Sequence, residues 1–269
     1  MRTKLVLVVN LVFFLTLSLF FISVADAAEK DKQPTIKNAL SELPEEVQKM
    51  RAIFNETVGG EVAADTDYLN QLSQDAARKF LSLSEETKLS QYFLYVDRNP
   101  SKQIAFVGFF NATDGNVAII GLDKISSGNE KRKGFFITPI GVFRNSPDFI
   151  SYRALGTKNE KGWRGLGTKG SRVWDFGWQK TTKNGEERMI RFLLHATDPI
   201  FGEKRLGKID SKGCIRISGK FNQFLDHHGL LDREYEAQKD KKRISWIFKS
   251  NREPALFAGQ YLLIGDSSQ

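Results

Sequence analysis

The chain has 269 residues, a formal charge of +8 and a single cysteine. This length can bury a full hydrophobic core in one or two domains, and a lone cysteine excludes an internal disulfide. One cysteine and three histidines supply few soft metal ligands, so we expect neither a metal nor another cofactor. The positive charge suits a polyanionic neighbourhood such as a cell wall, but it does not specify a partner.

The first residues have the pattern of an export signal. Arg2 and Lys4 precede an apolar run over residues 5–24, and the small residues that follow allow cleavage after Ala27. We therefore expect residues 1–27 to be a signal peptide, with an uncleaved anchor as the alternative. The protein would then reside in the periplasm or cell envelope, away from nucleic acid and without stable membrane insertion after cleavage.

Residues 28–90 are expected to form a helical N-terminal region. Between residues 35 and 83 apolar residues recur at helical spacing, and Pro44 suits a first helical turn. Gly59 and Gly60 interrupt the pattern, which predicts helices on either side of them. We expect these helices to pack on the main domain as a structural brace.

Residues 91–269 are expected to form one larger, β-rich domain. Its first part predicts strands over residues 91–96, 104–110, 117–125 and 134–137, and then a hairpin with strands over 172–179 and 188–195. Asn184-Gly185 supplies a strong hairpin turn. Because strands and helices do not alternate regularly, the pattern argues against a doubly wound sheet. The expected fold class is mainly β (α+β), a largely antiparallel sandwich or barrel-like domain with a helical preface.

The chain after residue 214 returns to a mixed pattern. A short helix is predicted over residues 220–228, ending at Gly229, and a second, polar helix follows. Strands are predicted over residues 244–248 and 260–264.

Two motifs that often mark ligand sites have simpler explanations here. Residues 165–170 match the dinucleotide-binding pattern G-x-G-x-x-G, but residues 171–178 read as a strand where that motif requires a helix. A glycine-rich surface loop is the favoured interpretation. His227 and His228 precede Gly229 in the last turn of a predicted helix, where imidazolium complements the helix dipole. We interpret both histidines as capping residues.

Cys214 and His195 are the strongest candidates for chemistry. A lone thiol in an exported chain is an inert core residue, an intermolecular partner or a reactive group. A neighbouring imidazole can accept the thiol proton and so generate the nucleophilic thiolate. Gly213 would let the backbone approach a substrate closely, and the Cys214 amide could stabilise an oxyanion. Spacing alone leaves a buried, unreactive cysteine open as an alternative.

The residues around this pair form a longer ordered pattern: His195, Ser211, Gly213, Cys214 and Arg216. The pattern resembles the signature of the L,D-transpeptidase (YkuD-type) catalytic domain. That signature has a histidine, a gap, and then Ser/Thr-His-Gly-Cys followed by an apolar residue and Arg or Asn.

A second block carries the same resemblance. Residues 138–143, Thr-Pro-Ile-Gly-Val-Phe, look like the family's Thr-Pro-x-Gly-x-Phe segment, and residues 125–128, Ile-Ser-Ser-Gly, precede it as in the family. The resemblance extends from residue 91 to residue 265 and leaves the helical preface outside it.

The resemblance implies a β-sandwich-like catalytic domain that acts on peptidoglycan stem peptides. Cys214 would attack the carbonyl between the third residue of a tetrapeptide stem and the terminal D-alanine, forming a thioester, with His195 as the base and later the acid. An amine acceptor would make the protein an L,D-transpeptidase of cell-wall biogenesis, and water would make it an L,D-carboxypeptidase. The alternative from another class is a catalytically silent wall-binding or scaffold protein.

The resemblance also implies roles for the other residues of the pattern. Arg216 would hold a substrate carboxylate, which a guanidinium fork suits well. Ser211 would hydrogen-bond near the histidine or merely form the turn. Lys212 departs from the family, which usually has a second histidine there, and a lysine cannot both donate and accept as a neutral imidazole does. The acceptor is therefore left open, although a cation beside the thiol would favour the thiolate.

Three aromatic residues lie in the long segment between the Thr-Pro block and the strand that begins at residue 172: Phe149, Tyr152 and Trp163. A segment of this kind can form a lid over an active site. A place in the core or on the surface is the alternative interpretation for each of them.

Overall fold

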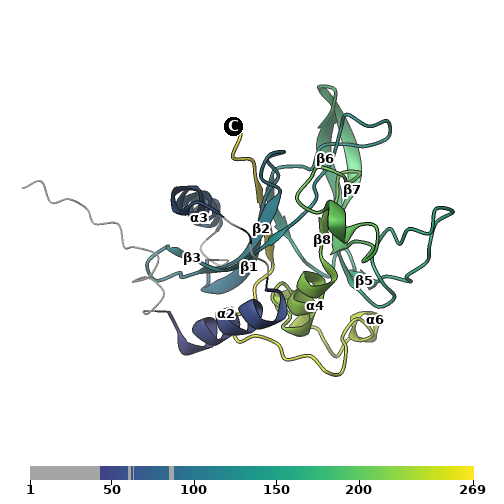
Figure 1. Cartoon of the computed structure of the whole chain (residues 1–269). Coiled ribbons are helices and arrows are strands. Elements are labelled where there is room, and N and C mark those ends of the chain that lie inside the picture. The colour runs from purple at the N-terminus through teal and green to yellow at the C-terminus, as the bar shows by residue number, and fades with distance from the viewer. Residues whose placement is uncertain (1–42, 60–61, 63, 85–87) are drawn as a thin grey trace, which may run out of the picture. The chain divides into compact units, whose positions relative to one another are not determined.

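The computed structural model describes residues 43–59, 62, 64–84 and 88–269 (Figure 1). These residues belong to one compact unit, which spans residues 35–269. The predicted signal peptide, residues 1–27, lies outside the described residues. Among the helices that are described, none is long and apolar enough to cross a membrane.

Two β-sheets form the centre of this unit and confirm the mainly β, α+β fold class. Sheet A has the strand order β3 (Val117–Lys124), β2 (Ile104–Phe110), β1 (Gln91–Asp97), β9 (Tyr261–Gly265) and β4 (Gly141–Arg144). Sheet B has the order β5 (Tyr152–Arg153), β6 (Arg172–Lys183), β7 (Glu186–Ala196) and β8 (Ile215–Ile217). Neighbouring strands are antiparallel, except that β1 with β9 and β7 with β8 run parallel.

The helices surround these sheets. They are α2 (Glu45–Thr57), α3 (Thr66–Leu81), α4 (Gly219–His227), α5 (Arg233–Glu236) and α6 (Lys242–Ser245), with a 3₁₀ turn, η2, at Glu203–Arg205. Helices α2 and α3 lie where the N-terminal pattern predicts helices. Asp65 caps α3, because its carboxylate accepts hydrogen bonds from two backbone amides of the first turn.

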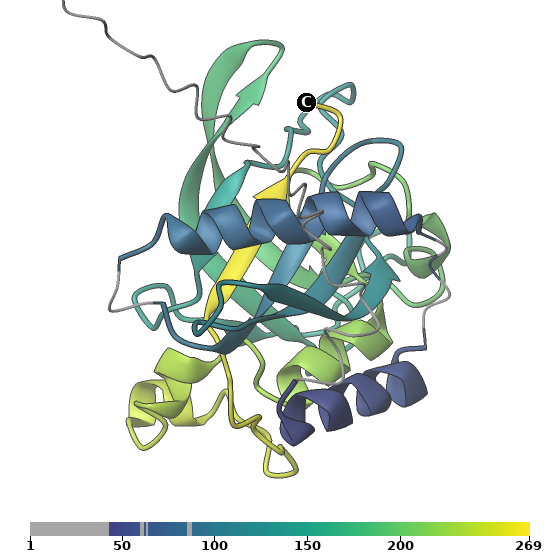
Figure 2. The same ribbon diagram turned by 90° about the vertical axis from the view of Figure 1, so that its left-hand side faces the viewer.

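Sheet A is buried on both faces. Side chains alternate across a strand, so Leu94 of β1 lies in the core shared with Phe192 of sheet B, whereas Phe93 packs with Phe80 of α3. This arrangement explains why all seven residues of β1 are buried. Figure 2 shows α3 lying across the face of sheet A.

Phe54 anchors α2 to the rest of the fold. Its ring meets Phe221 and Phe224 of α4 edge-on, with centroids 5.7 and 5.1 Å apart, and it packs against Gly121 of β3 where a Cβ would collide with it. Each aromatic pair contributes about 0.5–1.5 kcal/mol. We therefore expect Phe54→Leu to lower the free energy of unfolding by about 1–3 kcal/mol in urea denaturation. The control is Leu81→Ala, at a helix position 53% exposed, and an equal effect of the two changes would contradict the prediction.

The hairpin of β6 and β7 forms at the predicted turn. Asn184 and Gly185 both have positive φ, 53° and 80°, as a two-residue type I′ turn requires. Pairing begins at Lys183 and Glu186, so the strands extend further toward the turn than the sequence pattern predicts. The local turn chemistry thereby sets the register that carries His195.

The predicted strand over residues 134–137 is wrong. The chain turns at this point instead, with Gly134 at a φ of 75° and the Phe135 amide donating to the Arg132 carbonyl at 3.1 Å. A short apolar run such as Phe-Phe-Ile is compatible with a strand, but a turn residue with positive φ interrupts the pairing.

The predicted strand over residues 244–248 is also wrong, because Ile244 is the third residue of α6. Ile244 and Ile247 are three residues apart and share one buried cluster with Tyr235. That spacing is helical. The other predictions for this part of the chain are confirmed by α4 and β9 to within one residue at each end.

Candidate active site

Sheet B brings the candidate residues into one row. The pairing register joins Tyr152 of β5, Val173 of β6, His195 of β7 and Arg216 of β8. Paired residues share a face of a sheet, and the flanking residues Leu194 and Ile215 point into the main core. The row therefore lies on the face of sheet B that is turned away from this core.

Cys214 precedes β8 and lies beside the same row. Its Sγ is 3.7 Å from the carbonyl oxygen of Arg191 on β7. The charges of Arg216 and Asp175 both act on the pKa of the thiol. Cys214, two residues before Arg216, thus lies toward the face that carries His195, at the start of the strand that runs parallel to β7.

The imidazole of His195 is buried and held in one tautomer. Its Nδ1 lies 2.7 Å from the carbonyl oxygen of Ala196, and a carbonyl can only accept, so Nδ1 carries the proton. In a neutral ring the lone pair is then on Nε2. Within the described residues Nε2 makes no hydrogen bond, so it is available as a base.

The thiol and the imidazole are both neutral at rest. Desolvation lowers the pKa of His195 to about 4, although the Ala196 hydrogen bond opposes this shift. Desolvation also raises the pKa of Cys214 to about 11, against hydrogen bonding from Leu193 and the nearby charge of Arg216. The thiol therefore carries its proton at neutral pH, and forming the thiolate requires a base that accepts this proton.

The rate at which the Cys214 thiol is alkylated should reflect its raised pKa. The pKa of Cys214 is raised from 9.0 to about 11, and each unit lowers the thiolate fraction tenfold below the pKa. At pH 8 we expect iodoacetamide to react about 100-fold more slowly with the folded protein than with the urea-unfolded chain. The folded rate should rise with pH toward pH 11. A rate that already levels off near pH 7 would disprove a neutral resting thiol.

The loop before Cys214 is held by two hydroxyl groups. Ser211 Oγ accepts a hydrogen bond from the Gly213 amide at 3.0 Å and donates to the Cys214 carbonyl at 2.5 Å. Thr138 Oγ1 donates to the Gly213 carbonyl at 2.8 Å and accepts from the Gly128 amide at 2.8 Å. Ser211 thus stabilises the turn, and its two hydrogen bonds are to the backbone of the loop.

The Thr138 hydrogen bond also sets the direction of the Cys214 amide. The Gly213–Cys214 peptide is trans, so its N–H points opposite to its carbonyl. Because Thr138 holds the carbonyl, the Cys214 N–H points away from it, and this amide donates no hydrogen bond within the described residues. Gly213 has a φ of 126°, a conformation that favours glycine.

Arg216 belongs to a cationic cluster. Its Nη1 lies 3.2 Å from Asp210 Oδ2, and the same carboxylate contacts Arg132 at 2.9 Å and Arg205 at 2.5 Å. The indole of Trp163 lies under two of these guanidinium groups, with ring centroid distances of 5.6 Å to Arg205 and 5.7 Å to Arg216. One carboxylate facing these three arginines leaves an excess of positive charge beside the thiol.

Lys212 is exposed and stands apart from this cluster. Its Nζ lies 5.9 Å from the centroid of the Phe135 ring, and it forms no ion pair with any described residue. The cation that lowers the pKa of the thiol is Arg216. The site therefore has a positive charge near Cys214 that does not depend on Lys212.

The segment with the three aromatic residues borders the site. Phe149 lies against the guanidinium of Arg191 at 4.9 Å, and Trp163 covers the arginine cluster. Desolvation by burial raises the pKa of Tyr152, and the charges of Asp175 and Cys214 add to this shift. Tyr152 and Trp163 also line a cavity of about 580 Å³.

Sequence reasoning noted Tyr152 only as a lid candidate and did not identify Asp210. The sequence places Tyr152 only in a long loop, because its position in the row with His195 depends on the two-residue strand β5. Nothing in the sequence pairs Asp210 with three arginines. Both assignments come from the folded chain.

The structure places the glycine-rich segment and the two neighbouring histidines as follows. Residues 165–170 lead through a turn directly into β6, so no helix follows the G-x-G-x-x-G pattern. His227 is the last residue of α4 and His228 is its C-cap, with Gly229 at a φ of 55°.

Comparison with known proteins adds little to this geometry. No family model matches the chain, and no curated protein matches it. A solved structure described as "Structure of Bdellovibrio bacteriovorus Bd1075" is similar at 17% sequence identity with a TM-score of 0.31. The match covers 68% of this chain and 50% of that one, so the chain spans half the length of its solved neighbour.

Proposed function

We propose that this protein is a cysteine-dependent L,D-transpeptidase that acts on the tetrapeptide stems of peptidoglycan in the cell envelope. The observation that carries the proposal is the position of Cys214 directly before β8, the strand whose Arg216 pairs with His195 of β7. His195 lies on β7 and Cys214 immediately precedes the parallel neighbour β8, and the Nδ1 bond to Ala196 leaves Nε2 as the acceptor for the thiol proton. The resemblance to the L,D-transpeptidase signature supplies the substrate class.

In the first half of the reaction, Cys214 Sγ attacks the carbonyl carbon that joins the third stem residue to the terminal D-alanine. The thiol proton passes to His195 Nε2, and the carbonyl oxygen becomes an oxyanion that accepts a hydrogen bond from the Cys214 amide. Collapse of the intermediate breaks the C–N bond. His195 returns its proton to the departing D-alanine amine, and a thioester remains on Cys214.

In the second half, an amine of a neighbouring stem attacks the thioester carbon. His195 Nε2 removes a proton from this amine and returns it to the sulfur as the C–S bond breaks. The product is a new amide between the two stems, and the free thiol is restored. If water replaces the amine, the same steps give a tripeptide stem and the protein is an L,D-carboxypeptidase.

The charge next to the thiol fits an acidic stem peptide. The excess positive charge of Arg132, Arg205 and Arg216 around Asp210 attracts a substrate carboxylate. The cavity lined by Tyr152 and Trp163 supplies room beside this cluster. Recognition of the stem therefore rests on Arg216 and its neighbours, while Lys212 is free to meet the acceptor.

The test is incubation of purified protein with tetrapeptide-rich sacculi, followed by mass analysis of the muropeptides. We expect dimers with 3-3 cross-links and release of D-alanine. Tripeptides without such dimers would replace the transpeptidase proposal by an L,D-carboxypeptidase. Unchanged muropeptides together with protein bound to the sacculi would favour a silent wall-binding protein.

A further inference from the structure

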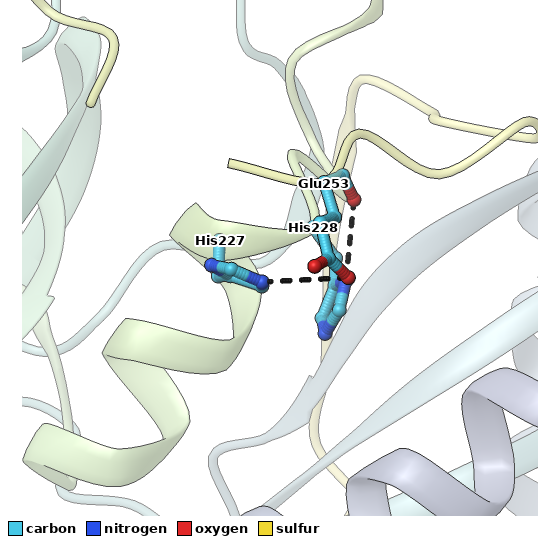
Figure 3. Close-up of side chains that lie close together, drawn as sticks. All are labelled: His227, His228 and Glu253. Carbon is cyan, nitrogen blue, oxygen red and sulfur yellow. Dashed lines mark hydrogen bonds and ion pairs between the residues drawn. The ribbon is translucent and has the colours of Figure 1, made fainter. Parts of the chain in front are cut away.

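A second group of chemistry-bearing side chains lies at the end of α4. His227 and His228 end this helix, and Glu253 reaches them from the segment that follows α6 (Figure 3). One ligand atom from each residue lies within 4.8 Å of the other two. His227 Nε2 and Glu253 Oε2 are 3.7 Å apart.

The backbone holds these residues together. The Glu253 amide donates to the His227 carbonyl at 2.9 Å, and the Ala255 amide donates to the His228 carbonyl at 2.9 Å. His228 Nδ1 lies 3.2 Å from the Glu253 carbonyl oxygen. The two histidines and the glutamate are thus placed by hydrogen bonds that do not use the His227 imidazole or the Glu253 carboxylate.

Nearby charges leave the Glu253 carboxylate available. Lys249 pairs with Asp226 at 3.6 Å, and Arg252 pairs with Asp232 at 2.9 Å and with Glu236 at 2.5 Å. These cations are therefore engaged elsewhere. The carboxyl end of a helix also carries partial negative charge, which favours a bound cation.

The ligand set has a recognisable chemistry. Two imidazoles and one carboxylate are a common ligand set for zinc when water takes the fourth position. Metal–ligand distances near 2.0–2.1 Å place ligand atoms roughly 3.4 Å apart. The ligand atoms of the three residues would therefore have to move by about 1 Å to bind one metal ion. The Glu253 side chain is 77% exposed and can make this movement.

We propose that His227, His228 and Glu253 form a binding site for a divalent transition metal, with Zn²⁺ as the best fit. The metal would tie the end of α4 to the segment that leads into β9, the strand between β1 and β4 in sheet A. The site would be separate from the row that carries His195, because none of its ligands belongs to that row. The proposal does not depend on the proposed function.

The experiment uses the full chain, purified without a histidine tag and stripped with a chelator. Co²⁺ serves as the spectroscopic probe, and Zn²⁺ affinity is measured by competition with a chromophoric chelator. We expect one metal per chain, visible absorption of a nitrogen- and oxygen-ligated Co²⁺ centre, and a higher melting temperature with Zn²⁺.

Three variants make the result specific. His227→Ala and Glu253→Gln should each weaken Zn²⁺ binding at least about 100-fold, since even the loss of a residue that only supports a ligand costs 10–100-fold. Glu160→Gln, at an exposed position, should bind as the native chain does. Circular dichroism is used to check that each variant is folded, which we expect because the side chains of His227 and Glu253 are 28% and 77% exposed.

Cys214→Ala removes the single thiol of the chain, a strong metal ligand outside this cluster, and should bind Zn²⁺ unchanged. Stoichiometric binding that is lost only in Cys214→Ala would assign the metal to the thiol and overturn the proposal. Binding unaffected by His227→Ala and Glu253→Gln, or no binding at micromolar Zn²⁺, would also overturn it.

Discussion

Replacing Cys214 by alanine is expected to lower the release of D-alanine from tetrapeptide muropeptides by at least about 10³-fold. The change removes the atom that forms the thioester, and no other described residue on this face of sheet B offers a thiol. The fold should be unaffected, because Cys214 is only partly buried and the Ser211 and Thr138 hydrogen bonds use the backbone of the loop. Release of D-alanine is measured by coupled assay, and the acyl-enzyme is sought by intact-protein mass spectrometry.

Two controls separate chemistry from binding. Cys214→Ala should still bind sacculi, because the arginine cluster is intact, and its urea midpoint should match that of the native protein. Lys204→Ala is the second control, because it removes an exposed positive charge that lies outside the Asp210 cluster. Turnover by Cys214→Ala at the native rate would exclude the thiol as nucleophile.

Replacing Thr138 by valine is expected to lower kcat about 10–100-fold with KM changed less than twofold. Valine fills a similar volume but cannot donate to the Gly213 carbonyl, so the Gly213–Cys214 peptide is no longer held. Loss of one oxyanion donor costs about 10²–10³-fold, and a donor that is misdirected rather than lost should cost less. Thr138 is in this respect a positioning residue that acts through the Cys214 amide.

The matched control is Thr197→Val. Thr197 is also buried, at 1% exposure, but its Oγ1 has no hydrogen-bond partner among the described residues. Thr138→Ser should restore most of the rate, since it returns the hydroxyl group. Iodoacetamide should alkylate Cys214 at the same rate in Thr138→Val and native protein, because that reaction needs no oxyanion donor. Equal loss of kcat in both valine variants would show that Thr138 serves only packing.

Local patterns predicted most of the fold. The hairpin of β6 and β7 follows from Asn184-Gly185, because only a few residue types tolerate positive φ at both turn positions. The strand predicted over residues 244–248, where α6 forms instead, was wrong because the local pattern did not decide the structure there. A short apolar run that contains Ile244 and Ile247 is compatible with a strand or a helix, and contact with Tyr235 decided for the helix.

The sequence by itself determined the fold class and the candidate pair Cys214 and His195, because strand alternation, turn chemistry and the ordered motif are properties of neighbouring residues. Only the tertiary structure decided what surrounds that pair. Thr138 reaches Gly213 across 75 residues of chain, and Glu253 returns to His227 by the path of the chain through α5 and α6. Such contacts depend on strand register and helix packing, which place distant residues together and carry no local signal.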